Sequence, residues 1–346
     1  MVSREHLSIL YLGSERGTSL DRANALRRLG HRVEHVDLRN LLPRTKWSNR
    51  VTWKIGGNLF SPWILRALPT TLKGKRNDLC YVDSGEWVTP RVIELLRRYA
   101  DKIVNYNIDD PLGMRDVARF KAYRQSISSY DLCVVVRSEN VAEALGLGAK
   151  DVLRVYRSSD EVTHAPRVIS EQDRARWGAE VLFLGTWFPE RGPFLLELVK
   201  LGVPLTIRGA NWEKAPEWPA LRSHWAGGHI EADDYVKAIQ CAKVNLGLLS
   251  KGNRDLHTTR SLEIPAVGGL LCAERTTEHL EMYVEGEEAL FWRDAEECAA
   301  VCRSILSEED RRQRIAEAGH ARSIANANFN ENVMKTIIQR VFAGER

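Results

Sequence analysis

The sequence lacks the features that would place a chain in a membrane, hold it together with disulfides or build it around a metal. No apolar run approaches the roughly 20 residues that a spanning helix requires, and the N-terminus does not have the layout of a signal peptide. The six cysteines are scattered, mostly inside apolar runs and without a C-x-x-C pair. They predict buried free thiols in a reducing cytosol. We therefore expect a cytoplasmic protein with no metal site.

The motifs of several enzyme classes are missing as well. Nothing in the sequence resembles G-x-x-x-x-G-K-[ST], G-x-S-x-G or H-E-x-x-H, so nucleophilic and metalloenzyme chemistry have no support. The loop at residues 13–17 (GSERG) does not match G-x-G-x-x-G, which makes a dinucleotide site a weak interpretation. A tight turn with Gly13 on the ligand-binding side of the domain is the stronger one.

Positive charge is concentrated in one half of the chain. Residues 1–170 hold 28 Lys and Arg against 19 Asp and Glu, whereas the remainder holds 22 against 27. The N-terminal half therefore carries about +9, which favours an anionic partner such as a phosphorylated acceptor, a membrane surface or nucleic acid. A solvated basic face explains the same surplus equally well.

The chain does contain a regular alternation of strand-like and helix-like segments. Apolar or alternating runs predict strands at residues 7–13, 31–36, 78–82, 102–106, 132–136, 181–185, 205–209, 244–249 and 270–273. Helical patterns occupy residues 19–29, 91–99, 115–128, 193–200, 232–242, 261–267, 310–325 and 332–342. This order predicts an α/β fold of two Rossmann-like, doubly wound domains facing a central cleft, with ligands at the carboxyl ends of both sets of strands.

The alternation breaks between residues 42 and 76, where basic and aromatic residues are interleaved. The segment contains Arg44, Lys46, Arg50, Lys54, Arg66, Lys73, Lys75 and Arg76 together with Trp47, Trp53, Phe60 and Trp63. Such a segment can lie on an anionic membrane surface or stack on nucleic acid. The alternative is an insertion whose aromatic side chains pack on the domain while its charges stay in water.

The most informative segment is residues 251–272, KGNRDLHTTRSLEIPAVGGLLC. A strand-like run ends in a polar loop, and Thr258 and Thr259 then open a short helical pattern that contains Glu263. The N–H groups and the dipole of a helix start favour an anion, whereas a carboxylate one turn inside suits sugar hydroxyls. Phosphate and sugar together predict a nucleotide-sugar.

Two other strand ends carry candidate residues. Asn107, Asp109 and Asp110 follow the strand at 102–106, where the carboxylates can hold an acceptor hydroxyl or act as a base; an Asx turn fixed by Pro111 is the alternative. In the C-terminal half, arginines in the loops after two strands can reach a diphosphate bidentately, or be surface charges. These arginines are Arg191 and Arg208.

Taken together, these residues resemble a glycosyltransferase of the GT-B type, and within it the CgeB-like (spore maturation) proteins with a group 1-like C-terminal domain. The segment RDLHTTRSLEIPAVGG is similar to that branch's R-[D]-x-H-T-x-R-x-[FL]-E-[I]-P-A-x-G signature, and VNYNIDDP to its strand ending in D-D-P. The resemblance implies an acceptor-binding domain at residues 1–170, a donor-binding domain at 171–325 and a crossover helix at 326–346 that returns toward the N-terminal domain.

The resemblance also implies roles for individual residues. Asp255 and Glu263 fall on the family's E-x7-E pair, in which the first carboxylate touches the donor sugar and the second holds the ribose. Thr258 and Thr259 fall on the diphosphate turn. The other expected donor-side residues are Gly185, Arg191, Arg208, His229, Ile230, Arg254, His257 and Arg260, and those on the acceptor side are Gly13 and Asn107.

With this resemblance, we expect a metal-independent and cofactor-free glycosyltransferase that uses a UDP-, GDP- or dTDP-linked sugar, and the resemblance implies that it retains configuration. Its acceptor is expected to be a glycan, a lipid-linked sugar or a small molecule in bacterial polysaccharide biosynthesis. If the reaction inverts configuration, Asp110 is the first candidate base and Asp109 the second. Peripheral contact with the inner face of the membrane through residues 44–76 is also expected. A non-catalytic glycan- or nucleotide-binding relative and a nucleic-acid-modifying glycosyltransferase stay open as alternatives.

Overall fold

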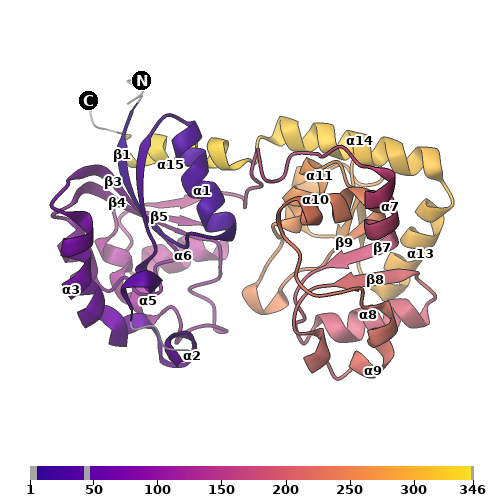
Figure 1. Ribbon diagram of the computed structural model, residues 1–346, viewed down its shortest axis with the longest axis horizontal. Coiled ribbons are helices and arrows are strands. Elements are labelled where there is room, and N and C mark those ends of the chain that lie inside the picture. Colours follow the sequence, from indigo (N-terminus) through magenta and orange to yellow (C-terminus); the bar gives the residue numbers. More distant parts are fainter. Residues whose placement is uncertain (1–5, 43–46, 344–346) are drawn as a thin grey trace. The chain divides into compact units, whose positions relative to one another are not determined.

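The computed structural model describes residues 6–42 and 47–343. Arg44 and Lys46 of the basic segment lie outside these residues. The chain divides into two compact units (Figure 1). Unit 1 runs to Tyr156 and resumes at Asn330, and unit 2 comprises Arg157–Phe329. Both boundaries expected from the sequence, after residues 170 and 325, fall inside unit 2.

Unit 1 is built on a six-stranded parallel sheet with the order β2-β1-β3-β4-β5-β6. Its strands are β1 (Ser8–Leu12), β2 (Arg32–Val36), β3 (Asn77–Asp83), β4 (Ala100–Asn107), β5 (Leu132–Val135) and β6 (Val152–Arg154). The first five coincide with predicted strands. The sequence did not predict β6, because this strand is three residues long and only half-buried.

Helices cover both faces of this sheet (Figure 1). They are α1 (Gly17–Arg28), α2 (Trp47–Ile55), α3 (Ser61–Leu72), α4 (Pro90–Leu96), α5 (Lys121–Ser126), α6 (Glu139–Gly146) and α15 (Asn330–Val341). On one face, Leu26 of α1 and Met334 of α15 share an apolar cluster with the sheet. On the other face, helices α3 to α6 enclose a second cluster. The final helix therefore returns to the N-terminal unit, as predicted.

The segment that interrupts the alternation is largely helical. Helix α3 buries Ile64, Leu68 and Leu72, which recur at helical spacing. Phe60 is buried as well, whereas Trp53 and Trp63 keep 53% and 49% of their surfaces exposed. Phe60 therefore packs on the domain, as the second interpretation of this segment predicts, whereas Trp53 and Trp63 are about half exposed.

Unit 2 has a five-stranded parallel sheet with the order β11-β10-β9-β7-β8. Its strands are β7 (Ala179–Leu184), β8 (Leu205–Arg208), β9 (Ala242–Gly247), β10 (Leu271–Glu274) and β11 (Leu290–Trp292). Its helices are α7 (Glu171–Trp177), α8 (Arg191–Lys200), α9 (Trp218–Leu221), α10 (Ala232–Cys241), α11 (Arg260–Ala266), α12 (Thr277–Met282), α13 (Ala295–Leu306) and α14 (Glu309–Asn326). The sequence predicted β7 to β10 but not β11, which is again only three residues long.

Both sheets place their first strand between the second and the third. The chain therefore turns to opposite sides after β1 and β3, and likewise after β7 and β9. In open α/β sheets, ligands bind at the carboxyl ends of the strands beside such a switch point. Each unit thus has one preferred place for a ligand. Within the described part of the chain, every helix is too short or too polar to span a bilayer.

Candidate functional site

The predicted donor segment connects β9 to α11. A 3₁₀ turn at Lys251–Asn253 and a left-handed Arg254, with φ of 53°, redirect the chain after the strand. The loop that follows buries Asp255 and His257, which are 7% and 1% exposed. These two predicted residues are thus part of the interior of unit 2.

Arg157 holds this loop together. Its Nη2 pairs with Oδ1 of Asp255 at 2.9 Å, and its Nη1 donates to the main-chain oxygen of His257. The main-chain N–H of Arg157 donates to Nε2 of His257 at 2.9 Å, so the ring proton lies on Nδ1, which contacts the carboxylate of Glu278. Asp255, expected to touch the donor sugar, is therefore one half of a buried ion pair.

His257 is neutral in this arrangement. Burial lowers its pKa to about 4, although the hydrogen bond to Glu278 acts in the opposite direction. The geometry supports the direction of the shift, because Nε2 cannot take a proton without losing the N–H of Arg157. His257 thus fixes the loop and does not offer a positive charge to a diphosphate.

Glu263 lies in the first turns of α11 and is 5% exposed. The hydroxyl of Tyr235 on α10 donates to its Oε2 at 2.5 Å. On the other oxygen, Nε2 of His164 lies 3.6 Å from Oε1. His164 Nδ1 accepts the main-chain N–H of Asp160 at 2.9 Å, so the neutral ring carries its proton on Nε2, facing Glu263. Two side chains distant in sequence thus orient the predicted ribose carboxylate.

The expected diphosphate turn is partly occupied by the protein itself. The main-chain N–H of Thr258 donates to Oγ of Ser261 at 3.0 Å, and Ser261 Oγ also contacts Nε2 of His279 at 2.7 Å. The hydroxyl of Thr258 is buried and has no hydrogen-bond partner among the described residues. Arg260 is half-buried, and its Nη1 donates to Thr259 Oγ1 at 3.3 Å. At Thr258 the hydroxyl is therefore unpaired within the described part of the chain, whereas the N–H is already bonded within the loop.

Arg191 lies at the switch point of unit 2. Its Nη1 donates to the main-chain oxygen of Thr186 at 2.8 Å, and its Nη2 to that of Leu248 at 3.2 Å. These carbonyls follow β7 and β9, so the guanidinium spans the carboxyl ends of both strands. A Cβ on Gly185 would lie 3.3 Å from Arg191 Nη1 and 2.7 Å from the Phe183 ring. Glycine is favoured there because a Cβ would collide with the Phe183 ring and crowd the guanidinium.

The remaining predicted donor residues lie in other surroundings. Arg208 stacks on Trp177, with 4.7 Å between its guanidinium carbon and the ring centroid. Burial lowers the pKa of Arg208, with a further contribution from Arg176. His229 is largely exposed, and its nearest carboxylate is Glu231 at 3.8 Å, while Ile230 is half-buried. The structure therefore groups Asp255, His257, Thr258 and Glu263 on one segment and gives Arg208 and His229 different neighbours.

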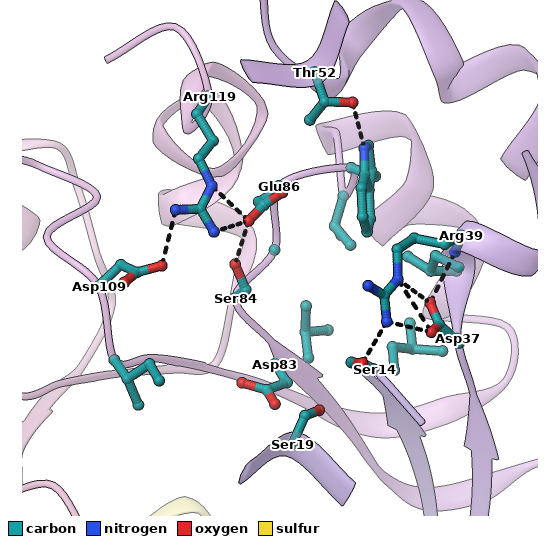
Figure 2. A pocket seen from close by; sticks show the side chains of 18 of the residues that line it. Ser14, Ser19, Asp37, Arg39, Thr52, Asp83, Ser84, Glu86, Asp109 and Arg119 are labelled. Carbon is teal, nitrogen blue, oxygen red and sulfur yellow. Dashed lines mark hydrogen bonds and ion pairs between the residues drawn. The ribbon is translucent and has the colours of Figure 1, made fainter. Parts of the chain in front are cut away.

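In unit 1, a cavity of about 360 Å³ opens at the switch point between β1 and β3 (Figure 2). Gly13 and Ser14 follow β1, and Asp83 to Glu86 end β3 and continue from it. The chain leaves β3 through two residues with positive φ, Ser84 at 69° and Gly85 at 88°. The side-chain amides of Asn105 and Asn107 both donate to Ser84 O, at 3.3 and 2.9 Å. Strained backbone held in this way is typical of functional sites.

Three ion-pair groups line this cavity. At its base, Arg22 and Asp83 pair at 2.8 Å with side chains 5% and 6% exposed, and the Tyr11 hydroxyl donates to Asp83 at 2.8 Å. Figure 2 shows the other two groups on opposite sides of the cavity. On one side Arg39 binds Asp37, with 2.6 Å between Nη2 and Oδ2. On the other side Arg119 pairs with Glu86 and with Asp109, the latter at 3.0 Å.

Some of the predicted acceptor-side residues line the cavity, and another holds the main chain next to it in place. Gly13 lines the cavity, and a Cβ there would meet Ser19 Oγ and the Tyr11 ring at 2.6 Å. Asn107 is 1% exposed and supports the cavity through its bond to Ser84. Asp109 lines the cavity.

Asp110, the first candidate base, has a structural role in the turn after β4. It is 3% exposed, and its Oδ1 accepts the Gly113 N–H and the Asn140 amide, each at 2.9 Å. This geometry is the Asx turn weighed as the alternative for this residue. It corrects the order of the two candidate bases, because Asp109 and not Asp110 faces the cavity.

Among the described residues, one group of side chains could hold a metal ion. Cys272, Cys298 and Cys302 have their sulfur atoms within 4.8 Å of one another, and all three are fully buried in the apolar core of unit 2. A further cavity in unit 2, of about 800 Å³, is lined by residues at the amino ends of β7, β8 and β9. That is the edge of the sheet opposite to the one where α/β proteins bind ligands.

Sequence reasoning missed the partners that orient the site. Arg157, Tyr235 and Arg22 act on residues far away along the chain, at separations of 98, 28 and 61 residues. A local pattern carries no signal for such pairs. One usable signal was Asp83, which directly follows the predicted strand at 78–82, much as Asp109 follows the strand at 102–106.

The chain is similar to known glycosyltransferases in sequence and in fold. Residues 191–339 match the family model described as glycosyl transferase-like. No curated protein matches the chain significantly in sequence. Among solved structures, sucrose-phosphate synthase from Thermosynechococcus elongatus has a TM-score of 0.69 at 13% identity, with 97% of this chain and 98% of that one covered.

Two further structures are similar over comparable lengths. Anabaena HepE in complex with UDP-glucose has a TM-score of 0.66 at 12% identity, covering 98% of this chain and 100% of that one. A glycosyltransferase from Rickettsia africae has a TM-score of 0.64 at 13% identity, covering 99% and 100%. Identities this low establish the fold alone, and the fold is GT-B. The match over residues 191–339 to the glycosyl transferase-like model agrees with the predicted enzyme class, a glycosyltransferase.

Proposed function

We propose that the protein transfers a sugar from a nucleotide-diphosphate sugar to an acceptor hydroxyl, with the donor bound by unit 2 and the acceptor by unit 1. The observation that carries this proposal is the buried carboxylate of Glu263, oriented by Tyr235 and His164 within the segment that matches the glycosyltransferase family. A carboxylate with one oxygen held by Tyr235 and the other 3.6 Å from His164 keeps lone pairs that can accept hydrogen bonds from a pair of sugar hydroxyls. The ribose of the nucleotide supplies such a pair.

The diphosphate is proposed to bind near Arg191 at the switch point of unit 2. Preorganised donors at the position where charge develops are usually the largest contribution to catalysis. In a retaining, metal-independent reaction, the leaving diphosphate itself takes the acceptor proton. The buried pair of Asp255 and Arg157 then acts by keeping the loop next to the donor sugar in place. UDP is the first nucleotide to test, because HepE was solved with UDP and with UDP-glucose.

A thermal-shift panel of UDP-, GDP- and dTDP-sugars tests the donor site. At 100 times Kd a ligand adds about 2.7 kcal/mol to the stability, which is readily seen. Glu263→Gln should abolish the shift, and Glu317→Gln, on the exposed face of α14, should leave it intact. An unchanged shift in Glu263→Gln would remove this residue from the donor site.

Turnover separates an enzyme from a non-catalytic relative. Release of the free nucleotide from the donor, with and without EDTA, should proceed at the same rate if no metal is required. A strict requirement for Mg²⁺ or Mn²⁺ would contradict the metal-independent mechanism. Analysis of the product anomer decides between retention and inversion, and a product that is inverted makes Asp109 the base to test first.

The finer assignments to the CgeB-like branch, to bacterial polysaccharide biosynthesis and to a membrane-peripheral location stay proposals. Ile55 and Leu59 of the basic segment are 53% and 56% exposed, which supports a contact surface. Sedimentation with vesicles that contain anionic lipid should carry the protein down at low salt if this surface binds membranes. A steep salt dependence of RNA or DNA binding would instead favour the nucleic-acid alternative.

A further inference from the structure

The cavity of unit 1 has a charge pattern that differs from the charge of the sequence around it. Among the side chains that the structure describes, four carboxylates and three guanidiniums line it, and none of these lining side chains is a lysine. The carboxylates belong to Asp37, Asp83, Glu86 and Asp109, and the guanidiniums to Arg22, Arg39 and Arg119. The described part of this wall therefore carries a formal charge of about −1, although the N-terminal half of the chain carries about +9.

We propose that this cavity binds an uncharged, hydroxyl-rich sugar as the acceptor, not a phosphorylated or otherwise anionic group. The proposal rests on the glycosyltransferase function proposed above and names the substrate class of its acceptor side. It replaces the expectation, drawn from the basic composition, that unit 1 takes an anionic partner.

Each lining arginine already has a carboxylate partner. Arg22 pairs with Asp83 at 2.8 Å, Arg39 with Asp37 at 2.6 Å, and Arg119 with both Glu86 and Asp109. Burial by itself would raise the pKa of Asp37, but the hydrogen bonds from Arg39 outweigh burial and hold it below its usual value. A phosphate entering this wall would have to displace a carboxylate from its arginine or lie next to it. Both are unfavourable, since like charges repel and a displaced charge is left desolvated.

Paired charges suit neutral hydroxyl groups well. A hydroxyl both donates and accepts, so it can donate to a carboxylate oxygen and accept from the neighbouring guanidinium without breaking their ion pair. Figure 2 shows the Arg39 and Arg119 groups on opposite sides, with Ser14 and Ser84 beside them. A sugar ring in the cavity would meet alternating donors and acceptors on both sides. The volume of about 360 Å³ is at the small end of the roughly 300–1,000 Å³ usual for small-molecule sites.

Trp53 gives the cavity an apolar surface. It lines the cavity with 53% of its surface exposed, and the guanidinium carbon of Arg119 lies 4.4 Å from its ring centroid. The face of an aromatic ring carries partial negative charge, so the C–H groups of a sugar ring pack well on it. An exposed tryptophan next to paired polar groups is a suitable combination for a sugar and a poor one for a compact anion.

The test is a binding measurement that involves no donor. Saturation-transfer NMR on the full chain would compare glucose, galactose and N-acetylglucosamine with their 6-phosphates. We expect at least one neutral sugar to bind and its phosphate to bind roughly tenfold more weakly or not at all. Trp53→Ala should weaken the neutral sugar roughly tenfold. Trp63→Ala, on α3 and similarly exposed, serves as the matched control and should change nothing.

A charge variant sharpens the test. Glu86→Gln removes one of the two carboxylates that neutralise Arg119 and brings the formal charge of the wall to about zero. The preference for the neutral sugar over its phosphate should then shrink severalfold. The proposal is overturned if the phosphates bind better than the sugars, if no sugar binds, or if Trp53→Ala behaves like Trp63→Ala. These outcomes are independent of the thermal shift by UDP-sugars, so failure here and failure of the donor site can be told apart.

Discussion

The switch points of the two sheets have the same topology but opposite chemistry. In unit 1, an arginine from the helix after the first strand pairs with a carboxylate that ends the third: Arg22 with Asp83 at 2.8 Å. In unit 2, the arginine in the same topological position, Arg191, donates to the carbonyl oxygens of Thr186 and Leu248. A carboxylate partner cancels the charge of a guanidinium, whereas carbonyl oxygens only orient it.

This difference shows how one architecture serves two kinds of ligand. The strand order determines where a ligand binds, and the residues that follow the strands determine its charge. The cavity of unit 1, with its internally neutralised wall, suits a neutral sugar. The oriented arginine of unit 2 suits a diphosphate.

The largest effect is expected from separating the two members of the Arg22–Asp83 pair. Arg22→Ala leaves Asp83 buried with one neutral donor, the Tyr11 hydroxyl, and should destabilise the protein by about 3–5 kcal/mol. The exposed pair of Arg28 and Glu331 is the control, because Arg28→Ala should cost no more than about 1 kcal/mol. Urea titration of the full chain measures both. Equal losses in the two variants would show that Asp83 is not the charge-balancing partner assumed here.

Removal of Arg191 tests the other side of the comparison. Arg191→Met should lower the kcat of donor turnover about 10²–10³-fold, as the loss of one preorganised donor to a leaving group usually does. Arg303, on α13, also donates to a carbonyl oxygen, that of Leu201 at 2.9 Å, so Arg303→Met controls for lost packing. Nucleotide release from the best-shifting donor is the measurement. An unchanged kcat would leave Arg191 as a purely structural link between β7 and β9.

The sequence predicted the sheets much better than it predicted these pairs. Strands such as residues 132–136 and 181–185 are buried on both faces, so each reads as a continuous apolar run. The three-residue β6 and β11 fall below the length at which a run stands out. Glu263 was identified because its signature is local. Its partners Tyr235 and His164 were not assigned to it, because folding brings them together from separate elements.

The position of Asp110 after a strand does not by itself determine whether its side chain faces a ligand. Both carboxylates follow β4 at the carboxyl edge of the sheet, as predicted, and Asp109 lines the cavity there. Which of two adjacent carboxylates faces the ligand depends on the turn that follows. Here the Gly113 N–H and the Asn140 amide hold Asp110 inside the protein. One of those partners is 30 residues away, so only the folded chain decides between the two.

Acidification should affect unit 2 through His257. Its pKa is lowered to about 4 by burial, from 6.5 in the unfolded chain. Below pH 6.5 the unfolded state binds a proton that the folded state does not, so stability falls as the pH drops toward 4, by at most about 3 kcal/mol. His35 in unit 1 has a pKa lowered in the same way but is only half-buried, so its contribution should be smaller.

Urea titrations between pH 7 and pH 4 measure this loss, and His257→Asn should flatten the profile. The contribution of Asp37 in unit 1 behaves differently. Because its folded pKa lies below the usual 3.8, that contribution is complete above pH 3.8 and is lost only at lower pH. A wild-type profile that stays flat from pH 6.5 to 4 would mean that His257 takes up a proton in the folded state.

The smallest effect is expected from removing the hydroxyl of a tyrosine that donates to a carboxylate, and each unit contains such a tyrosine. Tyr235 bonds Glu263 at 2.5 Å in unit 2, and Tyr11 bonds Asp83 at 2.8 Å in unit 1. Burial and the neighbouring carboxylate raise the pKa of both hydroxyls well above 10, so both stay protonated and donate. Tyr235→Phe frees Glu263 to rotate and should weaken UDP binding roughly tenfold, since a hydrogen bond to a charged group is worth about 1.5–3 kcal/mol. Tyr11→Phe should lower the free energy of unfolding about as much as Tyr235→Phe does, but it should leave the affinity for UDP unchanged. Calorimetry measures the affinity of both variants. Equal affinities in the two variants would mean that Glu263 needs no help from α10 to hold the ribose.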